Sequence, residues 1–133
     1  MTDNTLAYFT ADICTQHAMH PHHPESPMRL TAITQAIRKD KRFAIVETKP
    51  SDLHSIAKVH TADHIALCQS PVTENLLQLD PDTAINPSSW EAALHGVGAA
   101  KEAIDAVMQG QYQHGFCGVR PPGHHAEPDR VMG

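Results

Sequence analysis

Two adjacent histidines follow a rigid turn near the carboxyl end of the sequence, in the stretch "GVRPPGHHAEPDRVMG" (residues 118–133). Each proline fixes its own φ, and Gly123 can adopt backbone conformations that are closed to other residues, so this loop can aim the imidazoles of His124 and His125 with little slack. Histidine is the side chain whose ordinary pKa lies nearest neutrality, so one imidazole can accept a proton while the other holds or donates one. The spacing therefore indicates acid–base chemistry, with a polar surface turn as the alternative.

A second group of histidines lies in the segment "HAMHPHHPE" (residues 17–25), which contains His17, His20, His22 and His23. These imidazoles are numerous enough to bind zinc or nickel, so a histidine-rich metal-binding module is an alternative from a different functional class. Two prolines stiffen the segment, no cysteine joins it, and its spacing is not that of a zinc finger. We therefore expect histidines of a rim loop beside the entrance of an active site.

The first half of the chain has the pattern of alternating strands and helices that must position these loops. Residues 5–13 predict a strand, and Ser26 followed by Pro27 predicts the start of a helix that ends near residue 40. Its expected apolar face is Leu30, Ile33 and Ile37. Residues 42–48 predict a buried strand, and short helices are expected over 52–59 and 61–69. His60 and His64 have the i, i+4 spacing that would let them share a helical face.

The second half predicts one long helix and one further strand. Residues 70–87 contain three prolines and show no clear period, so we expect a long loop there. Ser88 and Glu91 have the spacing of a capping box that would start a helix over 89–109, with Gly110 after its end. The expected buried face of this helix is Trp90, Ala93, Leu94, Val97 and Ile104. Residues 114–120 then predict a buried strand that leads into the histidine loop.

This order of elements favours an α/β fold with a parallel sheet that is covered on its faces. In such sheets ligands bind just beyond the carboxyl ends of the strands. His124 and His125 come directly after a predicted strand, which places them at that edge.

The composition excludes several classes of protein. The chain has 133 residues, 41% of them hydrophobic and 19% charged, as expected for one small globular domain. The net charge is −5, so we expect no direct nucleic-acid binding. No apolar run approaches the length of a membrane span and no signal-peptide pattern is present, so we expect a cytoplasmic protein without membrane association. Cys14, Cys68 and Cys117 have no CxxC spacing, which predicts free, partly buried thiols.

The octapeptide "RPPGHHAE" (residues 120–127) resembles the signature of the histone deacetylase superfamily, which also includes acetylpolyamine amidohydrolases and acetoin-utilisation proteins. Three further segments resemble the family's motifs in the family's order: "HPESPMRL" (23–30), "VHTADHI" (59–65) and "DPDT" (80–83). The sequences of these motifs are more similar to those of the family's class II and bacterial deacetylase-like members than to those of its class I members. The resemblance implies a three-layer α/β/α fold of the arginase and deacetylase type. It also implies a zinc-dependent (Zn²⁺) deacetylase that acts on acetyl-lysine or an acetylpolyamine-like substrate.

The resemblance also implies roles for particular residues. His124 and His125 match the tandem catalytic histidines, which shuttle protons for the water on the zinc, with His125 as the principal general base and acid. Asp82 matches a rim residue that holds the substrate backbone. Arg29 matches an arginine near the internal channel through which acetate leaves.

In the family, the zinc ligands are an Asp-x-His pair and a later aspartate, and their positions lie downstream of Gly133. The closest candidate here, "DLH" at residues 52–54, falls where the family has a peripheral helix. We therefore expect no zinc ligand in this chain. Residues 1–133 are expected to be the N-terminal part of a single catalytic domain, truncated after the tandem histidines and inactive alone.

A parallel sheet cut after a few strands exposes backbone edges and apolar faces, so self-association into a homo-oligomer is also expected. The alternative is a naturally truncated, noncatalytic relative that binds acetylated ligands or partner subunits.

Overall fold

The computed structural model describes residues 5–133, which form both strands and helices. In chain order the elements are β1 (Leu6–Thr10), the 3-10 helix η1 (Asp12–Thr15), α1 (Pro27–Arg38), β2 (Phe43–Glu47), α2 (Leu53–Ala57), α3 (Ala62–Cys68), β3 (Leu77–Asp80), β4 (Thr83–Ile85), α4 (Ser89–Met108) and β5 (His114–Gly118).

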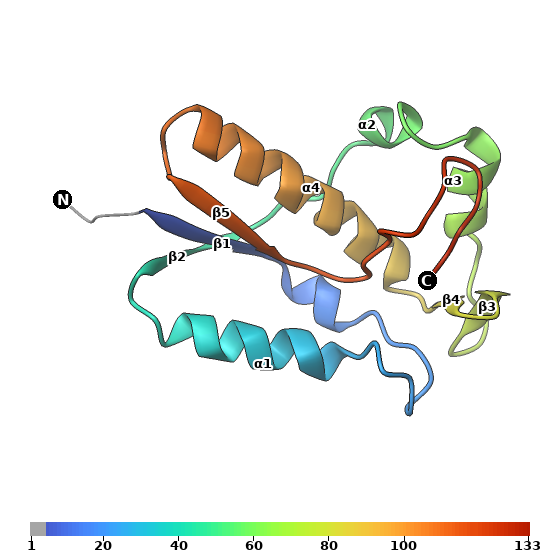
Figure 1. Cartoon of the computed structure of the whole chain (residues 1–133). Coiled ribbons are helices and arrows are strands. Elements are labelled where there is room, and N and C mark those ends of the chain that lie inside the picture. The colour runs from blue at the N-terminus through green and yellow to red at the C-terminus, as the bar shows by residue number, and fades with distance from the viewer. Residues whose placement is uncertain (1–4) are drawn as a thin grey trace.

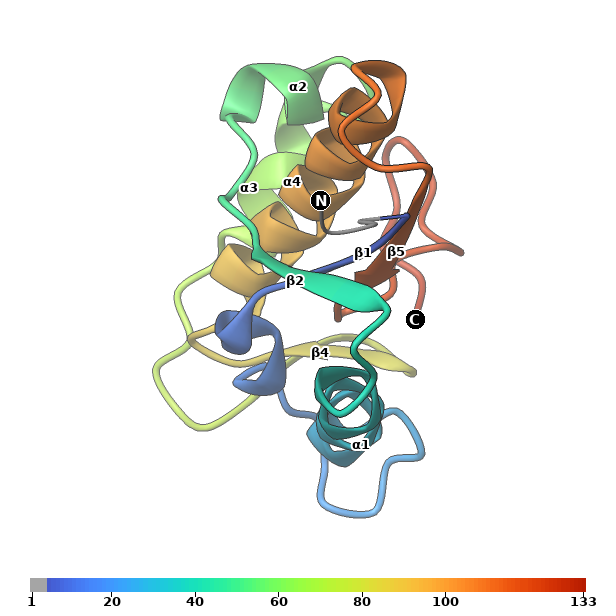
Figure 2. The ribbon, with the colours of Figure 1, turned by 90° about the vertical axis from the view of Figure 1, so that its left-hand side faces the viewer.

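The central sheet has the strand order β2-β1-β5, and both outer strands run parallel to β1. Tyr8 in β1 lies opposite Ile45 on one side and Phe116 on the other. Helices α1 and α4 cover opposite faces of this sheet, as both views show (Figures 1 and 2). The predicted three-layer α/β/α fold with a parallel sheet is therefore confirmed. Because all three strands run the same way, the loops after β1 and β5 leave the sheet at the same edge.

Strand β1 is buried on both faces, since successive side chains of a strand point in opposite directions. The prediction that the strands β2 and β5 are buried was wrong, because they are the outer strands of this sheet and their residues are mostly half-buried or exposed. Phe9 packs against small residues of α4, while the hydroxyl of Tyr8 lies 2.7 Å from Oγ1 of Thr34 in α1. Leu30 of α1 packs against Ala11 and Cys14 just beyond β1. The expected apolar face of α1 is only partly buried, because the side chain of Ile33 is 43% exposed.

Helix α4 packs on the sheet through a face different from the predicted one. Its buried hydrophobic residues are the small ones, Ala92, Ala99, Ala103 and Ala106. Small side chains let the helix backbone lie close to Phe9, whereas bulky ones would hold it away. The predicted face was wrong: Trp90, Ala93, Leu94 and Val97 line a cavity, and Ile104 is 62% exposed.

Two local predictions in the preceding segment were also wrong. Residues 70–87 contain an antiparallel hairpin, in which β3 and β4 are joined through Pro81 and Asp82. Ser88 has helical dihedral angles and makes no side-chain cap. Instead, Asn86 caps α4, because its Oδ1 accepts the backbone N–H of Ser88 at 3.0 Å and its carbonyl accepts that of Ser89 at 3.1 Å.

The remaining helix starts are close to those predicted. Ser26 is extended before Pro27, although its side chain accepts no capping hydrogen bond. Asp52 and Thr61 do cap α2 and α3 through their side chains. Among the described residues, no helix combines the length and the apolar character that crossing a membrane requires.

The segment that follows β2 lies directly against α4. The backbone N–H of Ser51 donates to the carbonyl of Leu94 at 2.9 Å, and that of Lys49 donates to Oε1 of Glu102 at 2.9 Å. A Cβ added to Gly98 would come within 1.9 Å of the carbonyl oxygen of Lys49. A Cβ on Gly96, two residues earlier on α4, would meet only Val119, at 3.7 Å.

We therefore predict opposite effects for the same substitution at these two glycines. Gly98→Ala should lower the free energy of unfolding by about 2 kcal/mol or more, because the backbone must move apart. Gly96→Ala should leave it unchanged or raise it by up to about 1 kcal/mol, since alanine is the better helix former. Urea denaturation followed by circular dichroism measures both, and equal losses would contradict the packing described here.

Candidate active site

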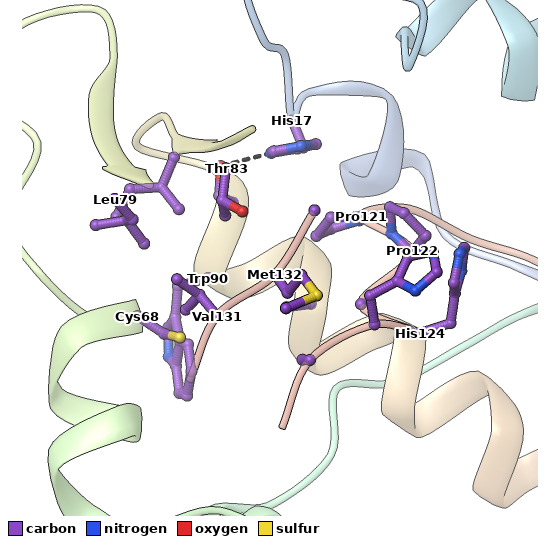
Figure 3. A pocket seen from close by; sticks show the side chains of 18 of the residues that line it. His17, Cys68, Leu79, Thr83, Trp90, Pro121, Pro122, His124, Val131 and Met132 are labelled. Atoms are coloured by element: carbon purple, nitrogen blue, oxygen red, sulfur yellow. Dashed lines mark hydrogen bonds between the residues drawn. The ribbon is translucent and has the colours of Figure 1, made fainter. Parts of the chain in front are cut away.

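A cavity of about 590 Å³ opens beside the carboxyl edge of the sheet. Its walls come from α3, α4, the β3–β4 hairpin, the 17–25 segment and the loop after β5. Figure 3 shows His124 and the two prolines of the loop on one side of the cavity, with Trp90 and Cys68 across from them. The lining combines apolar side chains with several imidazoles and the carboxyl groups of Glu25 and Asp82. Apolar walls with a few converging polar groups are typical of a ligand site.

The predicted histidine pair lies in the lining of this cavity, with both residues exposed. The ring centroids of His124 and His125 are 4.3 Å apart and their planes are inclined by 59°. Gly123 has φ +63°, which disfavours any other residue, and its carbonyl accepts the N–H of Ala126 at 3.0 Å. The glycine thus has the role that the sequence predicted, and the turn holds two imidazoles beside each other at the cavity.

The loop after β5 contains a buried arginine two residues beyond the strand. The guanidinium of Arg120 forms a bidentate ion pair with the carboxylate of Glu25. Nε donates to Oε1 at 2.9 Å and Nη2 donates to Oε2 at 2.6 Å. Its Nη1 donates to the carbonyl oxygens of Cys14 and His17. The side chain of Arg120 is only 4% exposed. A single buried cation therefore connects the histidine loop with the 3-10 helix and the 17–25 segment.

His17 is buried beside this ion pair. Its Nδ1 lies 2.6 Å from Oγ of Ser89 at the start of α4, and its Nε2 lies 4.0 Å from Oε2 of Glu25. Burial and the positive charge of Arg120 lower the pKa of His17 to about 4, although Glu25 opposes the shift. His17 is therefore neutral at physiological pH and contributes to packing.

Asp82 lies in the turn of the β3–β4 hairpin and lines the cavity. Its Oδ1 is 3.0 Å from Nε2 of His23, and its backbone N–H donates to Oδ1 of Asp80 at 2.8 Å. The hydrogen bond from the Asp82 backbone is the largest cause that lowers the pKa of Asp80, and hydrogen bonds from Thr83 add to it. The predicted rim residue and the histidine pair thus face the same cavity.

His60 lies before α3 and only His64 lies within it, so the two do not share a helical face as their spacing predicted, although the residues are neighbours. Their rings stack with centroids 4.2 Å apart and an angle of 8° between the planes. Nδ1 of His60 donates to the carbonyl of Pro128 at 3.2 Å, and the backbone N–H of Thr61 donates to the same oxygen at 3.0 Å. Burial lowers the pKa of His64. The start of α3 therefore holds the segment that follows the tandem histidines.

Arg29 lies elsewhere, exposed in the first turn of α1 and outside the cavity lining. Its role near an acetate channel stays a prediction. The sequence reasoning missed the pair Arg120–Glu25 and the contact of His17 with Ser89. A signal was available for the first, because Arg120 ends the segment that was predicted as a buried strand, where a charge needs a partner, and Glu25 lies in another of the quoted motifs.

The described residues do not form a metal site. Among residues 5–133, no group of three or more histidine, cysteine, aspartate or glutamate side chains is arranged to hold an ion. In the 17–25 segment, the imidazoles of His17, His20 and His23 contact three different partners, Ser89, Gln78 and Asp82. The residues present therefore do not fit a resident zinc ion.

Residues 23–133 match the histone deacetylase domain family, which confirms the resemblance seen in the motifs. The chain belongs to this family. Its fold is that of the HDA15 HD domain, whose crystal structure matches with a TM-score of 0.87 and 26% identity over 97% of this chain and 38% of that chain.

Curated relatives carry the same family names. A histone deacetylase-like amidohydrolase of Pseudomonas aeruginosa is 29% identical over 100% of this chain and 40% of its own length. Histone deacetylase 5 of Arabidopsis thaliana is 33% identical over 84% of this chain and 18% of its own. A polyamine deacetylase of Mus musculus is 31% identical over 77% of this chain and 17% of its own. The chain thus spans less than half the length of these relatives.

The buried pair predicts a large loss of stability when its geometry is disturbed. Arg120→Lys should lower the free energy of unfolding by about 3 kcal/mol. Lysine cannot form a bidentate ion pair with Glu25 and also donate to two backbone carbonyls. Arg42→Lys is the matched control, since Arg42 forms a similar bidentate ion pair with Asp40 at the surface. Exposed pairs contribute little, so the control should change urea unfolding far less. Equal losses in the two variants would contradict the importance of the buried pair.

The lowered pKa of His17 predicts a pH dependence of stability. Between pH 6.5 and about 4 the unfolded chain protonates this histidine while the folded chain does not, so acidification destabilises the fold across this range. The contribution of His17 should approach about 1.4 kcal/mol per pH unit and end below pH 4. Urea unfolding at several pH values should show a shallower dependence for His17→Gln than for the unaltered protein. His114→Gln, which alters an exposed histidine, is the control, and identical slopes in all three proteins would refute the assignment.

Proposed function

We propose that the intact protein is a deacetylase that hydrolyses the amide bond of acetyl-lysine or a related acetylated amine. The observation that carries this proposal is the tilted pair His124 and His125, presented to a cavity by a glycine turn within the family's signature. Family membership and the names of the relatives support the reaction class.

The chemistry assigned to this chain is proton transfer. Hydrolysis adds water across the amide: an O–C bond forms at the acetyl carbon, the C–N bond breaks, and the products are acetate and a free amine. One imidazole takes the proton from the attacking water, and a proton from the same pair reaches the leaving nitrogen. We assign the principal share of this work to His125, with His124 beside it. Two neighbouring imidazoles suit these two proton transfers, because one ring can accept a proton while the other holds or donates one.

Zinc dependence is part of the proposal. Bound zinc would polarise the carbonyl of the amide and lower the pKa of the attacking water. Since the described residues do not fit the metal, the chain of residues 1–133 alone is proposed to be inactive. Asp82 is proposed to hold the substrate backbone at the rim, and Arg29 to lie near the path by which acetate leaves.

Activity of the intact protein tests this proposal. We expect turnover of an acetyl-lysine peptide or an acetylpolyamine, loss on treatment with a chelator, and recovery with zinc. His125→Ala should lower kcat about 100-fold or more, as expected when a general base is removed. His114→Ala changes an exposed histidine of β5 and should leave kcat unchanged. Full activity in a His124→Ala, His125→Ala double variant would overturn the proposal.

A further inference from the structure

We propose that His23 is a positioning residue that fixes the orientation of the Asp82 carboxylate at the rim of the cavity. This inference rests on the proposed function, in which Asp82 binds the substrate backbone. It assigns a role to one histidine of the 17–25 segment, whose composition alone suggested metal binding.

The hydrogen bonds of His23 define its tautomer. Nδ1 accepts the backbone N–H of Glu25 at 3.1 Å, so this nitrogen carries no proton. The proton of the neutral ring is then on Nε2, which lies 3.0 Å from Oδ1 of Asp82 and donates to it. The backbone of the 17–25 segment thus sets the direction in which the imidazole points its one donor.

The backbone that sets this tautomer is itself fixed. The N–H bonded to His23 belongs to Glu25. The carboxylate of Glu25 accepts two hydrogen bonds from the guanidinium of the buried Arg120. Arg120 lies in the loop that presents His124. A continuous series of hydrogen bonds therefore runs from the histidine loop through Arg120, Glu25 and His23 to Asp82.

The bond between His23 and Asp82 suits a positioning role better than a stabilising one. The side chain of Asp82 is 75% exposed, and ion pairs at such positions add little to stability. The bond occupies Oδ1, and among the described residues no hydrogen-bond donor contacts Oδ2. One oxygen is held by the protein, and the other is free to accept a backbone N–H from a ligand. A second contact, between Nε2 of His20 and Oε1 of Gln78 at 3.3 Å, links the same two segments.

Steady-state kinetics of the intact protein with an acetyl-lysine peptide tests the assignment. His23→Ala should raise KM about fivefold and change kcat by less than about twofold, because the lost orientation affects binding of the substrate backbone. His23→Gln, whose amide can also donate, should restore part of the loss. In an Asp82→Ala background the same His23 substitution should have no further effect. Additive effects, or a fall in kcat with KM unchanged, would overturn the inference.

His22→Ala is the matched control, because His22 is an exposed neighbour in the same segment. It should leave KM unchanged, and thermal unfolding of both histidine variants should match that of the unaltered protein. A KM increase equal to that of His23→Ala would assign the effect to the loop as a whole and refute the specific role of His23.

A measurement independent of activity separates this inference from the proposed function. Two-bond ¹H–¹⁵N spectra of the imidazoles should show His23 as the Nε2–H tautomer, with an Nε2 shift that changes in Asp82→Ala. An inactive protein that shows this signature would refute the proposed function and leave the link between His23 and Asp82 intact. An Nδ1–H tautomer, or no response to the Asp82 substitution, would refute the link even in an active enzyme.

Discussion

The ion pair between the buried Arg120 and the half-buried Glu25 is the constraint on which the arrangement of the site depends. It joins residues 95 positions apart in the sequence, and the same guanidinium donates to the carbonyls of Cys14 and His17. Removing two charges from water is costly, so such a pair is weak evidence for stability as such. Its consequence is geometrical, because it fixes the loop after β5 relative to the loop after β1. The two segments that carry the imidazoles and the rim contact are thereby connected directly.

The parallel sheet makes this connection possible. Parallel strands bring their carboxyl ends to one edge, so the loops after β1 and β5 begin side by side although most of the chain separates them. Helix α4 contributes from the other side, since its first turn supplies Ser89 to His17. The site is therefore assembled where a strand edge and a helix start meet, and the hairpin containing Asp82 is attached to it through His20 and His23.

Much of this arrangement was predictable from local signals. The Pro-Pro-Gly turn identified Gly123 and the two imidazoles, and the helix and strand limits followed from periodicity and breakers such as Pro27 and Gly110. The buried face of α4 was not predictable in this way. The prediction assumed that the bulkiest apolar side chains are the buried ones, whereas close packing of the helix on Phe9 favours alanine. The hairpin was missed because its strands are short and begin and end near prolines. Contacts such as that between Arg120 and Glu25 depend on the tertiary fold, which no local pattern specifies.

The two faces of α4 differ in how freely they can change during evolution. The alanine face is in contact with the sheet, and any added volume there would separate two layers of the fold. The opposite face places Trp90, Leu94 and Val97 on the wall of the cavity, away from that contact. Substitutions among these larger side chains alter the shape of the cavity and leave the packing of the helix on the sheet unchanged. A single helix thus separates the residues that maintain the architecture from those through which related proteins can acquire different ligand preferences.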